Sequence, residues 1–350
     1  MRKVFWGCVV SFLVLFLVVS CEFASRVLVL DEDGGSSDVS ALLQKTTVRL
    51  FEGVEKDDLG LSLEDRVLRL SNGLSKKHGR SLIGTDVMGI TFDELASIIQ
   101  SQLDVVTIPE LLEPTAEDIA IISQDFPGLT EDEILVELEA ISRVYQDQIG
   151  ALAENAFLSA DYEPVPDGIT RSLYEGAPTV YEIAAALKHP LSALTITKQK
   201  DKAFALTGQY MGSTEVPTNT KKDAFRHAIW NIVMAKEGWG LKKEKIAWAK
   251  DMATAHEKGG NYVKVDSEMD LHNNTAGIRY YDANSTRKYT KILFIKIETG
   301  VSEPSYEKAA SAIKTKAESA KFVDKSKIGD SDAIKEINGV GADALVYIKK

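Results

Sequence analysis

The sequence has little cysteine, with Cys8 and Cys21 its two cysteines in 350 residues. Both stand at the N-terminal end, so we expect a mature domain without a disulfide, stabilised by a packed core instead. Long apolar runs are also scarce, and the one from Val4 to Val19 is too short for a comfortable membrane span. With 44% hydrophobic residues, the chain can still bury one or two cores.

The sequence also lacks the interleaved aromatic and basic residues on which single-stranded nucleic acids stack. The formal net charge of −11 becomes −13 when Arg2 and Lys3 are removed with an N-terminal export segment. We therefore do not expect a nucleic-acid partner.

The N-terminal residues are typical of an export signal, because two basic residues precede the apolar run. The run ends in VVSC at residues 18–21, which resembles the lipobox of bacterial lipoproteins, a pattern that prefers Leu in the first of these positions. The resemblance implies cleavage before Cys21 and lipidation of its thiol, so that acyl chains anchor the protein to a membrane. Glu22 does not resemble the Asp that retains lipoproteins at the inner membrane, which points to the outer membrane. An uncleaved N-terminal anchor and a plain export signal are the alternatives.

Composition divides the chain into five segments. Residues 1–20 are the export signal, and residues 21–44 carry acidic and turn residues without an apolar period, as a flexible tether does. Residues 45–160 are expected to form an acidic helical region. Residues 161–178 are rich in Pro, Gly and acid and serve as a linker. Residues 179–350 form a helical domain that contains most of the reactive side chains.

Charge is shared unevenly along the chain. Residues 22–186 carry 32 acidic against 11 basic residues, whereas residues 187–350 carry 20 acidic against 28 basic residues. This asymmetry suggests that the basic half binds an anion or docks on the acidic half. Two solvated surfaces of opposite sign are an equally good interpretation. The acidic half is also the part in which we expect a site for a partner protein.

Helix-start signals recur in the acidic region, where three threonines precede an acidic residue by three positions: Thr91, Thr115 and Thr130. The clearest helix follows the last of these, because apolar residues recur every three and four positions from Ile134 to Ile149. Near the C-terminus, Lys288 to Ile297 alternates enough for a strand, although a buried helix fits as well. The sequence therefore predicts a mainly α protein. Its helical N-terminal region precedes an all-α C-terminal domain with a polar centre between helices, and one or two short strands lie near the C-terminus.

Three of the five histidines fall between Asp223 and Gly277, in the motifs DAFRHAIWN, AHE and MDLHNNTAG. Asp223 and His227 are four residues apart, so on a helix they lie on one face. Both can bind one metal, or Asp223 can accept the second N–H of the histidine and fix its tautomer. A structural hydrogen bond between helices is the alternative for the same pair.

The other two motifs supply further polar residues. His256 and Glu257 end a second helix and point about a hundred degrees apart, so one can ligate while the other serves as a base. Asp270 and Asn274 are again four apart, in a third element. Asparagines that are buried need several hydrogen-bond partners and therefore belong to a network.

One His, a His-Glu pair and an Asp on successive helices resemble the ligand order of HD-type phosphohydrolases, although Glu257 stands where that family has Asp. Zinc-dependent phospholipases and related nucleases also place His and a carboxylate four apart, in the order opposite to Asp223 and His227. Both resemblances concern residue types, and they do not carry function by themselves.

The stretch from Pro190 to Arg279 is more closely similar to an uncharacterised bacterial domain that occurs in secreted, lipoprotein and toxin-like proteins. This resemblance implies an all-helical domain with a shared polar centre and no established activity. The positions that match the motif core of that domain are Asp223, Arg226, His227, Trp230, Asn231, His256, Glu257, Asp270, Asn273, Asn274 and Gly277.

The leading hypothesis is a metal-dependent hydrolase that acts on a phosphate ester. His227, His256 and Asp270 would hold a divalent metal, zinc or manganese, and His272 could replace one of these or add to them. The catalytic residues would be Glu257, Asp223, Arg226 and Asn274. Glu257 would be the base that activates the attacking water, and Asp223 would orient the metal-binding histidine. The other two would bind the substrate oxygens.

Two other functions are compatible with the same residues. In the first, the protein is a non-enzymatic envelope lipoprotein, the polar cluster joins three helices, and the acidic half binds a partner protein. In the second, it is a toxin-like effector that acts on nucleic acid or lipid. A cleft open to water beside Glu257 favours the hydrolase, and its absence favours the structural network.

Overall fold

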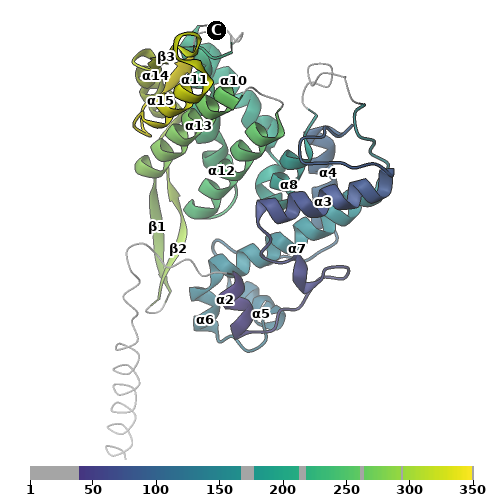
Figure 1. Ribbon diagram of the computed structural model, residues 1–350. Coiled ribbons are helices and arrows are strands. Elements are labelled where there is room, and N and C mark those ends of the chain that lie inside the picture. Colours follow the sequence, from purple (N-terminus) through teal and green to yellow (C-terminus); the bar gives the residue numbers. More distant parts are fainter. Residues whose placement is uncertain (1–38, 167–176, 213–217, 261–263, 293–294, 349–350) are drawn as a thin grey trace, which may run out of the picture. The chain divides into compact units, whose positions relative to one another are not determined.

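The computed structural model describes residues 39–166, 177–212, 218–260, 264–292 and 295–348 (Figure 1). The predictions for the export signal, for Cys21, for most of the tether and for residues 167–176 of the linker lie outside these ranges. The division of the chain into segments stays a prediction. Among the helices described, none is both long enough and apolar enough to cross a membrane.

Helices make up most of the described chain. The first part contains α2 (Val39–Lys45), the short helix η1 (Lys56–Asp58), α3 (Leu63–His78), α4 (Phe92–Leu103), α5 (Ala116–Asp125), α6 (Glu131–Val136) and α7 (Leu138–Ser159). The second part contains α8 (Val180–Lys188), α9 (Pro190–Ala193), α10 (Ile196–Met211), α11 (Lys221–Glu237), α12 (Lys242–Gly259), α13 (Lys264–Asn284), β1 (Thr286–Ile292), β2 (Ile295–Ser302), α14 (Tyr306–Glu318), β3 (Lys321–Val323), α15 (Lys325–Asn338) and β4 (Val346–Ile348). The predicted mainly α fold is confirmed.

Threonine capping boxes begin several of these helices, as the sequence predicts. At Thr91, Thr115 and Thr130, the threonine hydroxyl accepts a hydrogen bond from the backbone N–H three residues later. The acidic side chain at that later position accepts a hydrogen bond from the backbone N–H of the threonine. The helix expected after Thr130 is divided in two, because Glu137 leaves helical geometry with φ −95° and ψ 11°. The apolar stripe nevertheless stays buried from Ile134 to Ile149.

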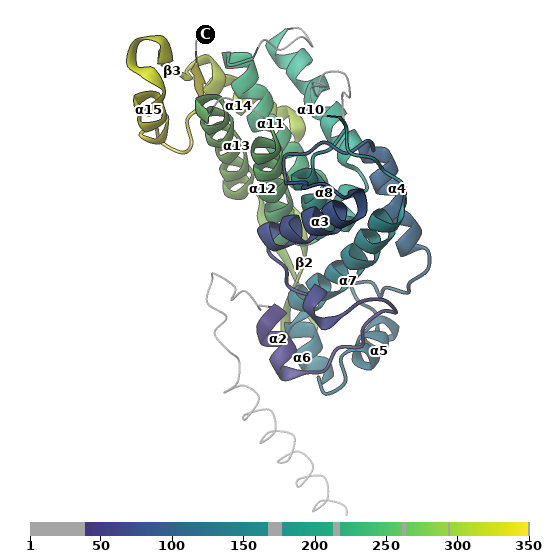
Figure 2. The same ribbon diagram turned by 45° about the vertical axis from the view of Figure 1, so that its right-hand side comes forward.

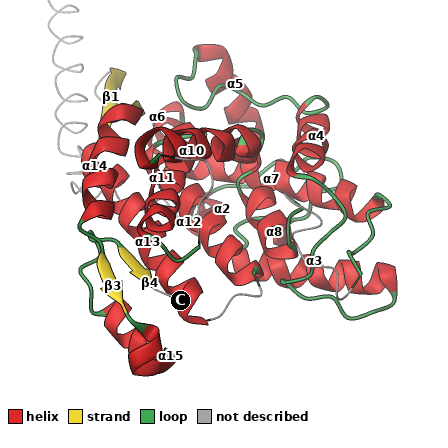
Figure 3. Ribbon diagram, turned by 90° about the horizontal axis from the view of Figure 1, so that it is seen from above, coloured by secondary structure: helices red, strands yellow, loops and turns green. Residues whose placement is uncertain are grey.

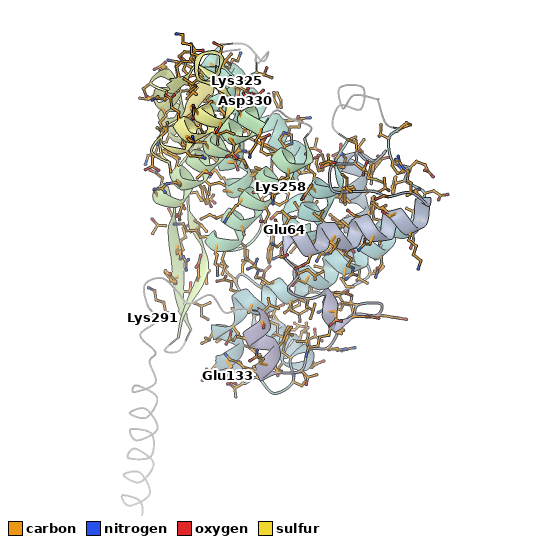
Figure 4. The ribbon with its side chains drawn as sticks, viewed as in Figure 1. Glu64, Glu133, Lys258, Lys291, Lys325 and Asp330 are labelled. Carbon is orange, nitrogen blue, oxygen red and sulfur yellow. The ribbon has the colours of Figure 1, made fainter. Side chains whose placement is uncertain are left out.

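Two large hydrophobic clusters hold the helices together. The larger one takes residues from α3, α4, α7 and α8 and continues through α10, α11, α12 and α14. The second lies around α2, α5, α6 and the first half of α7. Lys258 and Glu64, labelled in Figure 4, add an exposed ion pair of 2.9 Å between α12 and α3. The helices before and after residues 167–176 therefore share a core.

Helix α11 is central to the second part, since it packs against α10, α12, α13 and α14 (Figure 2). Its approach to α13 depends on Gly277, where a Cβ atom would lie 2.2 Å from the carbonyl oxygen of Ala228. Only a residue without a side chain permits that distance. The three polar motifs of the sequence lie on α11, α12 and α13 and are brought together by this packing.

The described strands form two small sheets near the C-terminal end (Figure 3). Strands β1 and β2 are antiparallel and include residues 288–292 and 295–297, so the sequence alternation there marks a strand rather than a buried helix. Strands β3 and β4 are parallel, with Phe322 opposite Tyr347. The final apolar residues pack as expected, because Leu345, Val346 and Ile348 are buried.

Candidate functional site

The first motif begins helix α11. Thr220 is its N-cap, and the Thr220 hydroxyl accepts the backbone N–H of Asp223. The helical repeat then places Asp223, His227 and Asn231 on one face, as predicted. All three are buried, with exposed fractions of 2%, 4% and 0%. A single helix face therefore brings a carboxylate, an imidazole and an amide into the interior.

The ligand atoms of three residues converge at one point. Asp223, His227 and Asp270 each offer an atom, and these atoms all lie within 4.8 Å of one another. Nε2 of His227 is 3.6 Å from Oδ1 of Asp223 and 3.2 Å from Oδ1 of Asp270. Imidazole nitrogen and carboxylate oxygen are the ligands that zinc and manganese accept. The group can hold a divalent cation between α11 and α13.

Arg226 lies against two of these residues, Asp223 and His227. Its guanidinium NH2 group is 2.6 Å from Oδ1 of Asp223 and 3.0 Å from Nε2 of His227. A guanidinium has no acceptor, so this nitrogen donates to Nε2 only if the histidine proton is on Nδ1. The arginine thereby favours the tautomer in which the lone pair of Nε2 accepts a hydrogen bond, and a metal at this nitrogen would have to displace the arginine.

The other ring nitrogen of His227 faces the second motif. Nδ1 is 3.8 Å from Oε1 of Glu257, which also accepts a hydrogen bond of 3.4 Å from the amide of Asn274. The side-chain oxygen of Asn274 in turn accepts a hydrogen bond of 2.7 Å from the side-chain amide of Asn231. This chain of amides and a carboxylate connects α11, α12 and α13, and it fixes the position of Glu257.

Burial and mutual repulsion change the acidities of the cluster. The pKa of Asp270 is raised to about 9, first by burial and then by the negative charges of Glu257 and Asp223. Burial also raises the pKa of Glu257. Burial and the neighbouring Arg226 hold the pKa of His227 well below its usual value. Buried carboxylates that repel one another beside a neutral imidazole are suited to a divalent cation.

His256 and His272, the other two expected metal ligands, lie outside the group of converging atoms. Nδ1 of His256 is 2.8 Å from Oε1 of Glu182 on α8, and its ring meets Trp230 edge-on at 5.2 Å between centroids. Nε2 of His272 is 3.0 Å from the backbone oxygen of Ala344, so it donates there. His272 therefore supports the C-terminal segment, while His256 lies beside the cluster.

A cavity of about 790 Å³ opens onto this cluster. Its wall includes the expected residues Asp223, Arg226, His227, His256, Glu257 and Asp270. Trp230, one of the positions of the motif core, also lines the cavity. The remaining wall residues were not expected at the site, and they are Thr91, Phe92, Asp93, Glu182, Ile196, Thr197, Lys200, Ala203, Phe204, Thr218, Asn219, Met252 and Asp266. Asn274 is not part of the wall.

Two of these additional residues connect to the cluster, Asn219 directly and Asp266 through Asn219. Asn219 donates its backbone N–H to Oδ2 of Asp223 at 2.6 Å and its amide to Asp266 at 3.1 Å. Asp266 also lies 3.3 Å from Nζ of Lys325, which is labelled in Figure 4. Asp266 stands four residues before Asp270, a spacing that places both on one helix face and that could have revealed it. Glu182 belongs to the capping box of α8, a role that accounts for this residue in the sequence. Its second contact, with His256, could not be read from that motif.

Residues 183–303 match the family model described as Domain of unknown function (DUF6973). No curated protein matches the chain. The matched range contains the converging ligand residues and Glu257, and it extends beyond Pro190–Arg279 on both sides. An uncharacterised domain therefore covers this part of the chain, and the match assigns no activity to it.

Proposed function

We propose that this domain is a metal-dependent hydrolase that acts on phosphate esters. The observation that carries the proposal is the convergence of Asp223, His227 and Asp270 within 4.8 Å at the wall of a cavity. A buried cluster of this kind costs free energy unless a cation or a proton neutralises it. A site that is open to a cavity of this size can bind both a cation and a substrate.

The metal would be zinc or manganese, held by Nε2 of His227 and by the carboxylates of Asp223 and Asp270. When bound, the ion would act as a Lewis acid that polarises a phosphoryl oxygen. His256, expected as a ligand, lines the cavity outside the group of converging atoms, where it would bind substrate. His272 would take no part, since its Nε2 is engaged with the backbone.

Glu257 would accept the proton of the attacking water. It lines the cavity, and its Oε2 atom makes no hydrogen bond within the described residues. A buried carboxylate with a raised pKa is a stronger base than an exposed one and is suited to this role. Asn274 would position Glu257 through the 3.4 Å hydrogen bond, and Arg226 would bind the phosphate oxygens.

A non-enzymatic function is the second candidate, and the chain from Asn231 through Asn274 to Glu257 favours it. That network connects three helices, as a purely structural polar core does. The cavity beside Glu257 supports the hydrolase instead, because a structural network has no need of one. A toxin-like effector would use the same site on another substrate.

The location of the protein is a separate proposal that depends on Cys21. We infer that the lipidated thiol anchors an exported protein to the outer membrane of a bacterium, and that the acidic half binds a partner protein there. Support comes from the VVSC motif at residues 18–21 and from the charge of residues 22–186. Cys21→Ala should release the protein from membranes, as fractionation would measure.

Metal content tests the hydrolase proposal. The chain from residue 22 should contain about one equivalent of zinc or manganese by elemental analysis, and His227→Ala should lose it. His272→Ala is the matched control, because it removes an imidazole from α13 outside the cluster. Absence of metal from a folded wild-type protein, even after it is reloaded with zinc or manganese, would contradict the proposal.

A further inference from the structure

Lys200 lies in the cavity wall without a partner. It belongs to α10, its side chain is half-buried, and it makes no ion pair or hydrogen bond within the described residues. Two other partly buried lysines are paired, Lys188 with Asp251 at 3.0 Å and Lys236 with Glu303 at 3.1 Å. An ammonium group that lies in a cavity wall and pairs with no carboxylate of the described residues is suited to bind an anion that enters from solution.

The same cavity has a hydrocarbon wall. Its large apolar side chains come from four helices: Phe92, Ile196, Phe204, Trp230 and Met252. Phe204 stands on the face of α10 that carries Lys200, and it belongs to none of the hydrophobic clusters formed by the described residues. Its ring is therefore available to a ligand rather than used in the core.

We propose that the cavity binds an amphiphilic phosphate ester, with the phosphate near Lys200 and Arg226 and a hydrocarbon chain against Phe204 and Trp230. The proposal rests on the hydrolase function, since it names the substrate class of that site. Ion pairing selects the phosphate, and burial of the chain supplies the binding energy that a small phosphate lacks.

A hydrocarbon fits this wall better than a nucleobase does. The hydroxyls of Thr91 and Thr197, which lie among the apolar residues, already donate to Glu94 at 2.8 Å and to Asp93 at 2.7 Å. A nucleobase placed there would leave polar edges without partners, which an alkyl chain does not have. The cavity volume of about 790 Å³ lies within the usual range for a small organic ligand.

The phosphate also requires the cation. Asp93, Glu182, Asp266 and the three carboxylates of the cluster surround the cavity, so a phosphate meets strong repulsion in a protein without metal. Ligand binding should therefore depend on a divalent ion. That dependence separates the proposed site from an ordinary hydrophobic groove.

Isothermal titration with non-hydrolysable alkylphosphonates tests the proposal on the chain from residue 22. With Mn²⁺ present, octylphosphonate should bind at least about tenfold more tightly than butylphosphonate, because each buried methylene contributes roughly fourfold. With EDTA, both should bind at least about tenfold more weakly. Equal affinity for the two phosphonates in Mn²⁺-loaded protein would overturn the inference without contradicting the proposed hydrolase function. Tighter binding of thymidine monophosphate than of octylphosphonate would have the same consequence.

Two variants test the binding of the phosphonate group and of the hydrocarbon chain separately. Lys200→Ala should weaken both phosphonates by the same factor, roughly tenfold, and Lys198→Ala, exposed on the same helix, should weaken neither. Phe204→Ala should reduce the advantage of octylphosphonate and leave butylphosphonate nearly unchanged. If the ratio of the affinities for octylphosphonate and butylphosphonate were unchanged in Phe204→Ala, the placement of the hydrocarbon chain against Phe204 would be overturned. Failure of the wild type to bind Mn²⁺ in the same titrations would count against the hydrolase itself.

Discussion

Nε2 of His227 lies 3.2 Å from Oδ1 of Asp270, across the interface between α11 and α13. The contact is possible because the two helices touch at Ala228, the residue after His227, and at Gly277, about two turns along α13 from Asp270. The geometry of the three converging residues therefore depends on a helix contact to which none of them belongs.

That dependence predicts a large effect of Gly277→Ala. The new methyl group would meet the carbonyl oxygen of Ala228 at 2.2 Å, so the helices must separate. We expect a loss of roughly 1–3 kcal/mol in the free energy of unfolding, measured in urea, together with weaker metal binding. Gly341→Ala is the control, since a Cβ atom there meets nothing within 4 Å. Equal stability of the two variants would show that the interface is looser than described.

Glu257→Gln distinguishes a catalytic base from a structural partner. A glutamine keeps the size and can still accept from Asn274, but it cannot take a proton from water. For the hydrolase, turnover of a phosphodiester should fall by at least about 100-fold, while metal content and thermal stability stay the same. If the residue is only structural, stability should fall by about 1–3 kcal/mol. The control is the same substitution at a partly exposed residue of α13, Glu268→Gln.

Metal affinity should increase with pH. The pKa of Asp270 is about 9 in the absence of metal, so below that pH a proton competes with the cation for the carboxylate. His227 adds no competition near neutrality, because its pKa lies well below the usual value. Titration with Mn²⁺ between pH 6 and pH 8 should show an affinity that rises by up to about tenfold per pH unit. Asp270→Asn should bind weakly at every pH; a flat profile in the wild type would contradict the assignment.

Stability should decrease as pH rises through the range in which Glu244 ionises. Burial between α7 and α12 raises the pKa of Glu244 from 4.5 to about 7, so the folded protein holds a proton there that the unfolded chain releases. The contribution to stability is therefore greatest below pH 4.5 and is lost by about pH 7, by roughly 2–4 kcal/mol.

Urea unfolding at several pH values measures this change. Glu244→Gln should remove that part of the pH dependence, because glutamine does not ionise. It should also keep an acceptor for the hydroxyl of Ser142, which now donates to Glu244 at 2.8 Å. Glu117→Gln, on the exposed start of α5, should keep the slope of the wild type. A slope that survives in Glu244→Gln would assign the effect to another buried acid.

Local signals in the sequence were sufficient for most helices. The capping boxes at Thr91, Thr115 and Thr130 and the apolar stripe after Ile134 depend on residues that are near one another in the chain. The interruption at Glu137 could not be predicted, because nothing in its neighbourhood is a helix breaker. It follows from the packing of α6 and α7 in one cluster, which is a tertiary effect.

The site was predictable to the same extent. Helical spacing placed Asp223 and His227 on one face, and the third motif supplied Asp270. The separation of His272 from the cluster follows from spacing as well. His272 is two positions after Asp270, and residues two positions apart on a helix point to nearly opposite sides. The contact between Glu182 and His256 could not be found, because it depends on how α8 packs against α12.

Asn273 is the neighbour of both Asn274 and His272 on α13, and it binds strand β4. Its amide donates to the oxygen of Val346 at 2.9 Å, and its side-chain oxygen accepts the Val346 N–H at 2.9 Å. A protease that trimmed the last few residues would therefore remove both partners of a fully buried amide one position from the site. Such a truncated protein would retain every proposed metal ligand and still lose a contact that holds α13 against β4. We therefore expect the proposed metal binding to weaken on storage before any unfolding is visible.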